Sequence, residues 1–168
     1  MAEPTAGVCK GLVCEPKIFE GNQNVDGLRF ALVVSQFNTE VTAGLLEGAL
    51  VHLKKAGVSG EAITVAKVPG AYEIPLVVQQ LARTKNFNAI IALGCVIRGD
   101  TIHFEMICES VFRSLQEIAL ATGIAVTSGL VMAEDLEQAR ARSGGNVANR
   151  GEEAAQAALQ MANLLRHF

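Results

Sequence analysis

The residues most capable of chemistry lie in one short polar segment, residues 98–105, which contains Arg98, Asp100, Thr101 and His103. An apolar run, residues 89–93, leads directly into this segment, and an amphipathic helical pattern follows it. The pattern therefore predicts a buried strand that ends in a polar turn. Imidazole side chains titrate near neutral pH, so His103 is a candidate proton carrier. A capped loop with a surface histidine is the alternative interpretation.

The start of the following helix is a candidate anion site. Gly99 allows close approach to the backbone, and the amide groups at a helix N-terminus attract negative charge. Thr101 can add its hydroxyl group, and Arg98 and Arg142 are the nearest candidate cations. The chain has neither a G-x-x-x-x-G-K-[ST] nor a G-x-G-x-x-G motif, which favours a single phosphate as the anion. Complementing a helix dipole is the alternative role for Arg142.

The elements that must position these residues alternate regularly along the chain. Apolar runs predict strands at residues 28–34, 63–66, 89–94 and 124–131. Helical spacing and stop signals predict helices at residues 39–56, 71–83, 104–122, 133–142 and 149–165. Strands joined by such helices must run parallel, through right-handed crossovers. The prediction is an α/β fold, a three-layer α/β/α sandwich with a four-stranded parallel sheet, flavodoxin-like in class.

Parallel strands place their carboxyl ends at one edge of the sheet, where ligands bind in open α/β folds. The polar turns that we expect there begin at Ser35, Val68, Gly94 and Ser128. Aromatic residues make up only 5% of the chain, so Phe37 and Tyr72 at this edge indicate a flat ring as the ligand, on which Phe37 can stack. A cap on the hydrophobic core is the alternative role for Phe37.

Composition limits the class of protein. A chain of 168 residues, half of them apolar, is long enough for one domain with a hydrophobic core. We expect a mobile tail at residues 1–17 and a single domain at residues 18–168, where residues 18–21 form a short strand that can add to a neighbouring sheet. The net charge of −3 without a basic block argues against nucleic acid as a partner. No apolar run reaches membrane-spanning length.

The cysteines and histidines do not suggest a metal site. The chain has four cysteines and three histidines, but they lack the clustered spacing of zinc ligands. His103-x-Glu105 matches half of a zinc deaminase motif, and the P-C-x-x-C half is absent. Reduced thiols and the lack of a secretion-signal pattern are typical of a cytoplasmic protein.

Four motifs occur in order along the chain: Ser35-x-Phe37-Asn38, Val68 to Pro75, Gly94 to Glu105, and Asn149-Arg150-Gly151-x-Glu153. Together they resemble the 6,7-dimethyl-8-ribityllumazine synthase family over about residues 18–168. The resemblance implies condensation of 5-amino-6-(D-ribitylamino)uracil with 3,4-dihydroxy-2-butanone 4-phosphate, the penultimate step of riboflavin biosynthesis. The products are 6,7-dimethyl-8-ribityllumazine, phosphate and water. It also implies that no metal or organic cofactor is needed.

The resemblance implies a role for each matching residue. His103 transfers protons, and Phe37 stacks on the pyrimidine ring. The butanone phosphate is bound by Asp100, Thr101 and Arg142. The other contacts to ribitylaminouracil are Ala71, Tyr72, Glu73, Cys95, Val96, Ile97 and Ser128. Many family members carry an aromatic residue where this chain has Ser128, and loss of that wall is expected to weaken binding by roughly 1 kcal/mol.

The resemblance also implies an assembly. The active sites form between subunits of a ring pentamer, with Phe37, Tyr72 and His103 from one subunit and Ser128 and Arg142 from its neighbour. In the family members that this chain would resemble as an isolated pentamer, the linker before the last helix carries an insertion. The linker of this chain, residues 143–149, has none. This favours twelve pentamers in a 60-subunit icosahedral cage, with riboflavin synthase as a candidate partner.

Two other functions compete with a working enzyme. A catalytically weak cage, or a scaffold that binds lumazine, has Ser128 as its only support in the sequence. A flavodoxin-type electron carrier shares the fold class, but the chain lacks a first loop rich in phosphate-binding serine and threonine.

Overall fold

The computed structural model describes residues 16–145 and 147–168 and contains one parallel sheet. Its strands are β1 (Phe30–Ser35), β2 (Ile63–Val68), β3 (Ala89–Ile97) and β4 (Ala125–Ala133). They lie in the order β2-β1-β3-β4, and every neighbouring pair is parallel. The chain leaves β1 toward β2 and then crosses back to β3. The connections therefore diverge between β1 and β3, which is where ligands bind in open α/β sheets.

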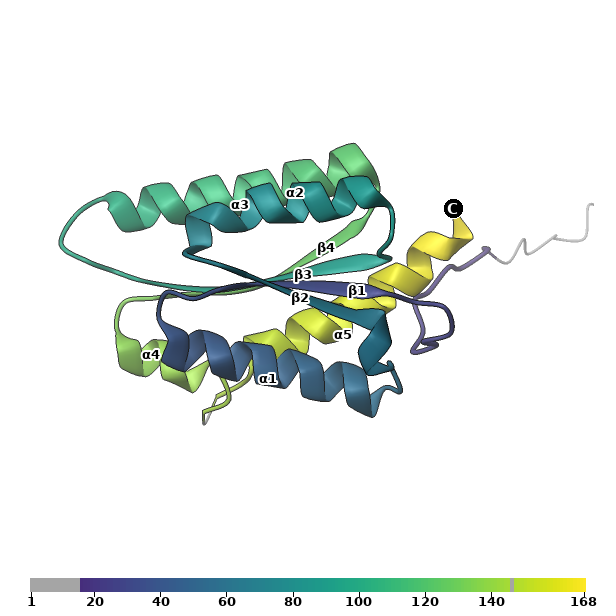
Figure 1. The fold of residues 1–168 in the computed structure, drawn as a ribbon, viewed down its shortest axis with the longest axis horizontal. Helices are drawn as coiled ribbons and strands as arrows, with labels where there is room; N and C mark the ends of the chain where they lie inside the picture. Colours follow the sequence, from purple (N-terminus) through teal and green to yellow (C-terminus); the bar gives the residue numbers. More distant parts are fainter. Residues whose placement is uncertain (1–15, 146) are drawn as a thin grey trace, which may run out of the picture.

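Helices cover both faces of the sheet (Figure 1). On one face lie α2 (Ile74–Thr84) and α3 (His103–Thr122). On the other lie α1 (Thr39–Lys55), α4 (Leu136–Ala141) and α5 (Arg150–Leu164). Short 3-10 turns occur at Gly60–Ala62, Ala71–Glu73 and Leu165–His167. The predicted three-layer α/β/α sandwich with a four-stranded parallel sheet is confirmed.

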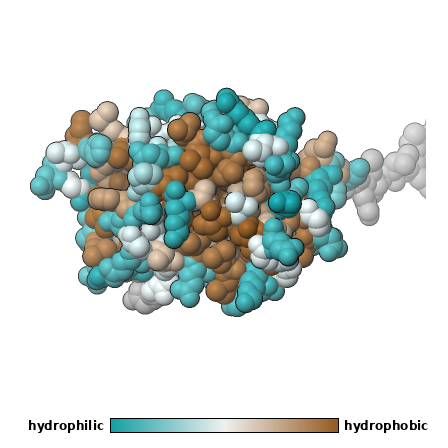
Figure 2. Space-filling view, viewed as in Figure 1, coloured by the Kyte–Doolittle hydropathy of each residue, from teal (hydrophilic) through white to brown (hydrophobic). Residues whose placement is uncertain are grey.

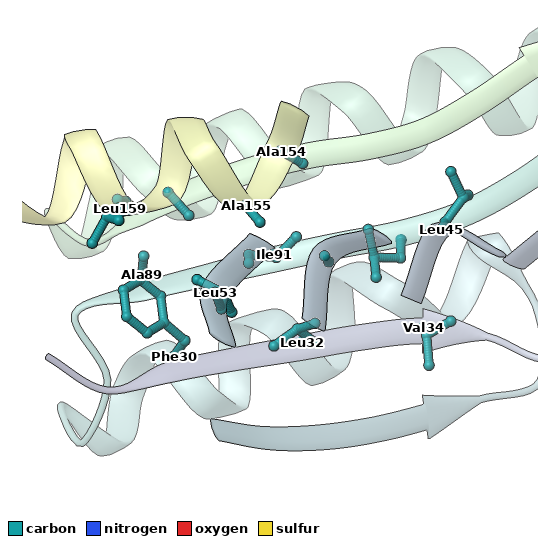
Figure 3. Close-up of a cluster of buried hydrophobic side chains, with 14 of the residues drawn as sticks. Phe30, Leu32, Val34, Leu45, Leu53, Ala89, Ile91, Ala154, Ala155 and Leu159 are labelled. Atoms are coloured by element: carbon teal, nitrogen blue, oxygen red, sulfur yellow. The ribbon is translucent and has the colours of Figure 1, made fainter. Parts of the chain in front are cut away.

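The central strand β1 supplies side chains to two separate cores. Phe30, Leu32 and Val34 pack with Leu45 of α1 and Leu159 of α5 (Figure 3). The intervening residues of β1 pack on the opposite side, against α2 and α3. All six residues of β1 are buried. This explains why the strand reads as a continuous apolar run, as expected for a sheet covered on both faces.

Helices α1 and α5 pack in close contact because glycines line their interface. A Cβ added at Gly151 would lie 1.9 Å from the Leu45 carbonyl oxygen, and one added at Gly48 would lie 2.3 Å from the Asn149 side chain. Asn149 caps α5, since its side chain accepts bonds from the Gly151 and Glu152 amides. Its Nδ2 also donates to the Gly44 carbonyl at 2.9 Å. One polar side chain thus begins α5 and joins it to α1.

Several predicted boundaries are wrong, for reasons of strand pairing and turn geometry. Pairing between β3 and β4 continues to Ile97 and Ala133, so β3 extends past its predicted end at Gly94, and α4 begins at Leu136 and not at Ala133. Ser128 therefore lies in the middle of β4 and not in a turn after it. The first residues of the second predicted helix, Ala71–Glu73, form a 3-10 turn, and α2 begins at Ile74. Pro75 stands in its first turn, where the missing N–H costs little.

The predicted strand at residues 18–21 does not pair with the sheet of this chain. Phe19 packs instead against the C-terminus, with its ring centroid 5.5 Å from that of His167 and 5.2 Å from that of Phe168. Most of the predicted mobile tail, residues 1–15, lies outside the described residues. Within the described ranges, no helix has the length and apolar character needed to cross a membrane.

Candidate functional site

A pocket of about 830 Å³ lies at the carboxyl ends of β1, β2 and β3, against the first turns of α3. It is formed by the turns that follow these strands, so residues distant in the sequence share one cavity. Most of the predicted site residues line it: Phe37, Ala71, Tyr72, Glu73, Cys95, Val96, Ile97, Thr101 and His103. Its lining also includes Asn38, which is not among the predicted site residues.

Phe37 forms an exposed apolar wall of the pocket. The turn that carries it is held by backbone bonds, from Gln36 N to the Val68 oxygen at 2.8 Å and from Phe37 N to the Pro69 oxygen at 3.0 Å. Phe37 as a whole remains 70% exposed, so it does not cap the core of this chain. An aromatic face held on a fixed backbone beside a cavity can stack on a flat ligand.

Asn38 holds this turn in an uncommon conformation. Its backbone is left-handed, with φ 56° and ψ 48°, a region that asparagine enters more readily than most residues. Its Nδ2 donates to the Cys95 carbonyl oxygen at 3.1 Å, which ties the turn after β1 to the end of β3. Its own carbonyl accepts the first amide bonds of α1, from Val41 and Thr42. No sequence signal reveals the Cys95 bond, because the partners are 57 residues apart.

The second wall is the turn between β2 and α2. The Glu73 carboxylate accepts a bond from the Gly70 amide at 2.9 Å, which folds the turn back on itself. A Cβ added at Gly70 would lie 3.0 Å from the Glu73 Oε2 atom, so glycine permits this close approach. Ala71 is buried, whereas Tyr72 is 64% exposed. The turn therefore presents one carboxylate and one phenol on a fixed backbone.

The floor of the pocket is the end of β3. Gly94 lies under it, and an added Cβ there would meet the Leu130 side chain at 2.7 Å. Cys95 is buried, and burial raises the pKa of its thiol to about 11. The thiol is therefore protonated at neutral pH and is not a nucleophile. Val96 and Ile97, which are half-buried, complete the floor.

The start of α3 brings Thr101 and His103 to the pocket. The His103 amide donates to the Thr101 hydroxyl oxygen at 3.4 Å, a long bond at the first turn of the helix. Both side chains are exposed. An imidazole in this place can exchange protons with solvent and with a molecule in the pocket. Free amide groups at the start of the helix favour an anion nearby.

Three predicted site residues do not line this pocket. Asp100 lies beside it and is exposed. Ser128 is exposed on the edge strand β4, where its Oγ accepts a bond from the Leu130 amide at 3.3 Å. Arg142 follows α4, and its Nη1 donates to the Gln138 carbonyl at 3.1 Å. Among the described residues, no group of three or more His, Cys, Asp or Glu side chains has the arrangement to hold a metal ion.

The parallel sheet, its strand order and the open pocket at the divergence of β1 and β3 define an α/β protein of flavodoxin-like topology with a small-molecule site. Comparison with protein families matches residues 27–166 to the family described as 6,7-dimethyl-8-ribityllumazine synthase. A protein of that name from Desulfotalea psychrophila is 43% identical over 150 residues, which cover 89% of this chain and 97% of the relative. The chain therefore belongs to the 6,7-dimethyl-8-ribityllumazine synthase family.

Proposed function

We propose that this pocket catalyses the family reaction, a transferase step of riboflavin biosynthesis in which 5-amino-6-(D-ribitylamino)uracil condenses with 3,4-dihydroxy-2-butanone 4-phosphate. The product is 6,7-dimethyl-8-ribityllumazine, with release of phosphate and water. The observation that carries the proposal is the meeting of Phe37, Glu73, Thr101 and His103 in one cavity, from the three turns that follow β1, β2 and β3.

The pyrimidine site is assigned to the walls and floor of the pocket. Phe37 stacks on the ring of ribitylaminouracil. The polar ribityl chain lies along Ala71, Tyr72 and Glu73, where a carboxylate and backbone groups can bind hydroxyls. Residues 95–97 face the edge of the pyrimidine. The mostly apolar cavity with a few fixed polar groups supports this assignment.

His103 is assigned to proton transfer. Attack of an amine on a ketone forms a carbinolamine, and loss of water then gives an imine. Both steps need a proton moved between nitrogen and oxygen, and a histidine can carry it in either direction. His103 is exposed at the pocket, which supports this role. Much of the remaining rate acceleration is expected from holding the two substrates together.

The phosphate of the second substrate is assigned to the start of α3. Asp100, Thr101 and the nearby backbone amides lie at this end of the pocket, and Arg142 supplies the positive charge. Because Arg142 and Ser128 do not line the pocket of their own chain, we assign them to the site of an adjacent subunit.

Such sharing requires an oligomer, and we propose a pentamer. Exposed apolar side chains on and beside α2 and α3 support an assembly: Leu76, Ile102, Met106, Phe112 and Leu120. Figure 2 shows that apolar residues also gather across the middle of one face of the molecule. Burial of these surfaces favours association. We expect twelve pentamers to form an icosahedral cage of 60 subunits, with riboflavin synthase as a candidate guest.

Light scattering at fixed protomer concentration tests the assembly, and an isolated pentamer or monomer would contradict the cage. A location in the cytoplasm is proposed on the free thiols of Cys95 and Cys108. Cell fractionation tests this location.

The experiment that tests the activity mixes the purified protein with the two substrates and follows the lumazine chromophore and free phosphate. Turnover well above the spontaneous rate supports the enzyme. No turnover from an assembled oligomer would contradict it and would favour a scaffold that binds lumazine. Ser128, which stands where many family members have an aromatic residue, is then the first residue to replace.

A further inference from the structure

Arg98 lies next to the proposed phosphate site, but its guanidinium is already paired with two carboxylates. Its Nη1 contacts Glu105, in the first turn of α3, and its Nε contacts Glu134, just after β4, at 2.6 Å. Its Cζ lies 4.4 Å from the centre of the Phe104 ring. Its backbone amide donates to the Ala133 oxygen at 2.9 Å. Arg98 therefore joins the end of β3 to α3 and to the end of β4.

This pairing makes Arg98 a poor ligand for phosphate. Two carboxylates surround one guanidinium, so the cluster carries a net negative charge when all three groups are ionised. Hydrogen bonds from Arg98 lower the pKa of Glu105, and the bonds to Glu105 and Glu134 raise the pKa of Arg98. Two carboxylates beside one guanidinium offset its positive charge, so the cluster would repel a phosphate dianion.

The same pairing spans the loop that holds the proposed phosphate ligands. Arg98 and Glu105 are seven residues apart, and residues 99–102 lie between them with Asp100 and Thr101. Little else surrounds this loop. A Cβ added at Gly99 would meet no atom within 4 Å, and residues 99–102 are exposed. The ion pairs of Arg98 therefore hold the two ends of this loop close together.

We propose that Arg98 is a positioning residue that fixes the loop at residues 99–102 for the butanone phosphate, and is not itself a phosphate ligand. This inference rests on the function proposed above. Its physical basis is the forked guanidinium, which can contact two carboxylates at once, whereas an ammonium group acts as a point charge. Arg98→Lys is therefore expected to keep the charge and to lose much of the bridging.

The test measures the KM of each substrate separately in Arg98→Gln, Arg98→Lys and Glu134→Ala. We expect each to raise the KM for butanone phosphate by about three- to tenfold, because small displacements of bound groups are costly. The KM for ribitylaminouracil is expected to change by less than about twofold. Arg98→Gln combined with Glu134→Ala should cost less than the sum of the single effects, because both changes open the same bridge.

The Glu134 variant separates positioning from direct binding. If Arg98 bound phosphate itself, removal of Glu134 would free its guanidinium and lower the KM for butanone phosphate, and Arg98→Lys would retain most of the affinity. Either result would overturn the proposal. Arg113→Gln is the matched control, since Arg113 lies on α3, as Glu105 does, and forms one exposed ion pair with Glu109. It should leave both KM values unchanged.

Amide hydrogen exchange of the peptide that covers residues 99–104 gives a readout independent of activity. Arg98→Lys and Glu134→Ala should speed exchange there and leave α5 unchanged. Unchanged exchange would overturn the proposal even if the KM values moved. If the wild-type protein showed no turnover, the proposed function would fail, while exchange would still report on the loop. Arg98→Lys and Glu134→Ala keep the test decisive if Arg98→Gln does not fold.

Discussion

Replacing Asn38 with alanine or glycine tests how the pocket holds its aromatic wall. Both variants lose the bond from Asn38 Nδ2 to the Cys95 oxygen, a loss of about 1 kcal/mol. In Asn38→Ala, alanine must also adopt the left-handed backbone conformation, at φ 56°. This conformation costs alanine about 1 kcal/mol more than it costs glycine. We therefore expect Asn38→Ala to lower the free energy of unfolding by about 2 kcal/mol and Asn38→Gly by about 1 kcal/mol or less.

The affinity for ligand should depend on the position of the Phe37 ring, and not only on the stability of the fold. Loosening the turn after β1 lets Phe37 leave its stacking geometry, so affinity for 6,7-dimethyl-8-ribityllumazine should fall by up to about tenfold in Asn38→Gly. Fluorescence titration measures this affinity, and urea unfolding at fixed protomer concentration measures stability.

A double-mutant cycle with Phe37→Ala decides whether Asn38 acts through Phe37. In the Phe37→Ala background, Asn38→Gly should cause little further loss of affinity, because the ring that it positions is gone. Full additivity of the two losses would refute this reasoning. So would equal stability of the alanine and glycine variants, since the backbone argument requires them to differ.

Four further predictions concern the site and the packing. His103→Ala should slow turnover without abolishing it, because holding the substrates together still accelerates the reaction; an unchanged rate would remove His103 from the mechanism. Because burial raises the pKa of Cys95 to about 11, iodoacetamide at pH 8 should label it far more slowly in the folded protein than in urea, as read by mass spectrometry. For the same reason the free energy of unfolding should fall as the pH rises from about 9 to about 11, since the unfolded thiol loses its proton first. Gly151→Ala should destabilise the protein by about 3 kcal/mol or more, because the new methyl group would meet the Leu45 oxygen. Gly60→Ala, with no atom within 4 Å of the added Cβ, is its control and should change stability by under about 0.5 kcal/mol; similar melting curves for the two variants would contradict the packing account.

The order and type of the main elements were predictable because their signals are local. Continuous apolar runs marked the buried strands, and helical spacing marked the helices on both faces. Gly123 marked the end of α3, where its left-handed φ of 70° terminates the helix. Asn149 marked the start of α5, where its side chain accepts the first amide bonds. Each signal depends on a few consecutive residues.

The composition of the candidate site was also partly predictable. Parallel strands place their carboxyl ends together, so motifs that follow separate strands had to converge on one edge. Phe37, Glu73, Thr101 and His103 follow this rule and line one pocket. The place of Ser128 was not predictable in this way, because the length of β4 depends on its pairing with β3 as far as Ala133.

Only the tertiary structure decided how the site residues are held. The sequence shows Arg98 as a cation near a phosphate loop, but its charge is paired with Glu134, 36 residues away. Asn38 is a turn residue in the sequence, and its partner Cys95 lies on another strand. Periodicity and capping are properties of neighbouring residues, so the sequence determined the elements and their order. Ion pairs and hydrogen bonds between elements depend on side-chain atoms that meet only after the chain has folded, so the structure alone determined which charges and backbones are fixed at the pocket.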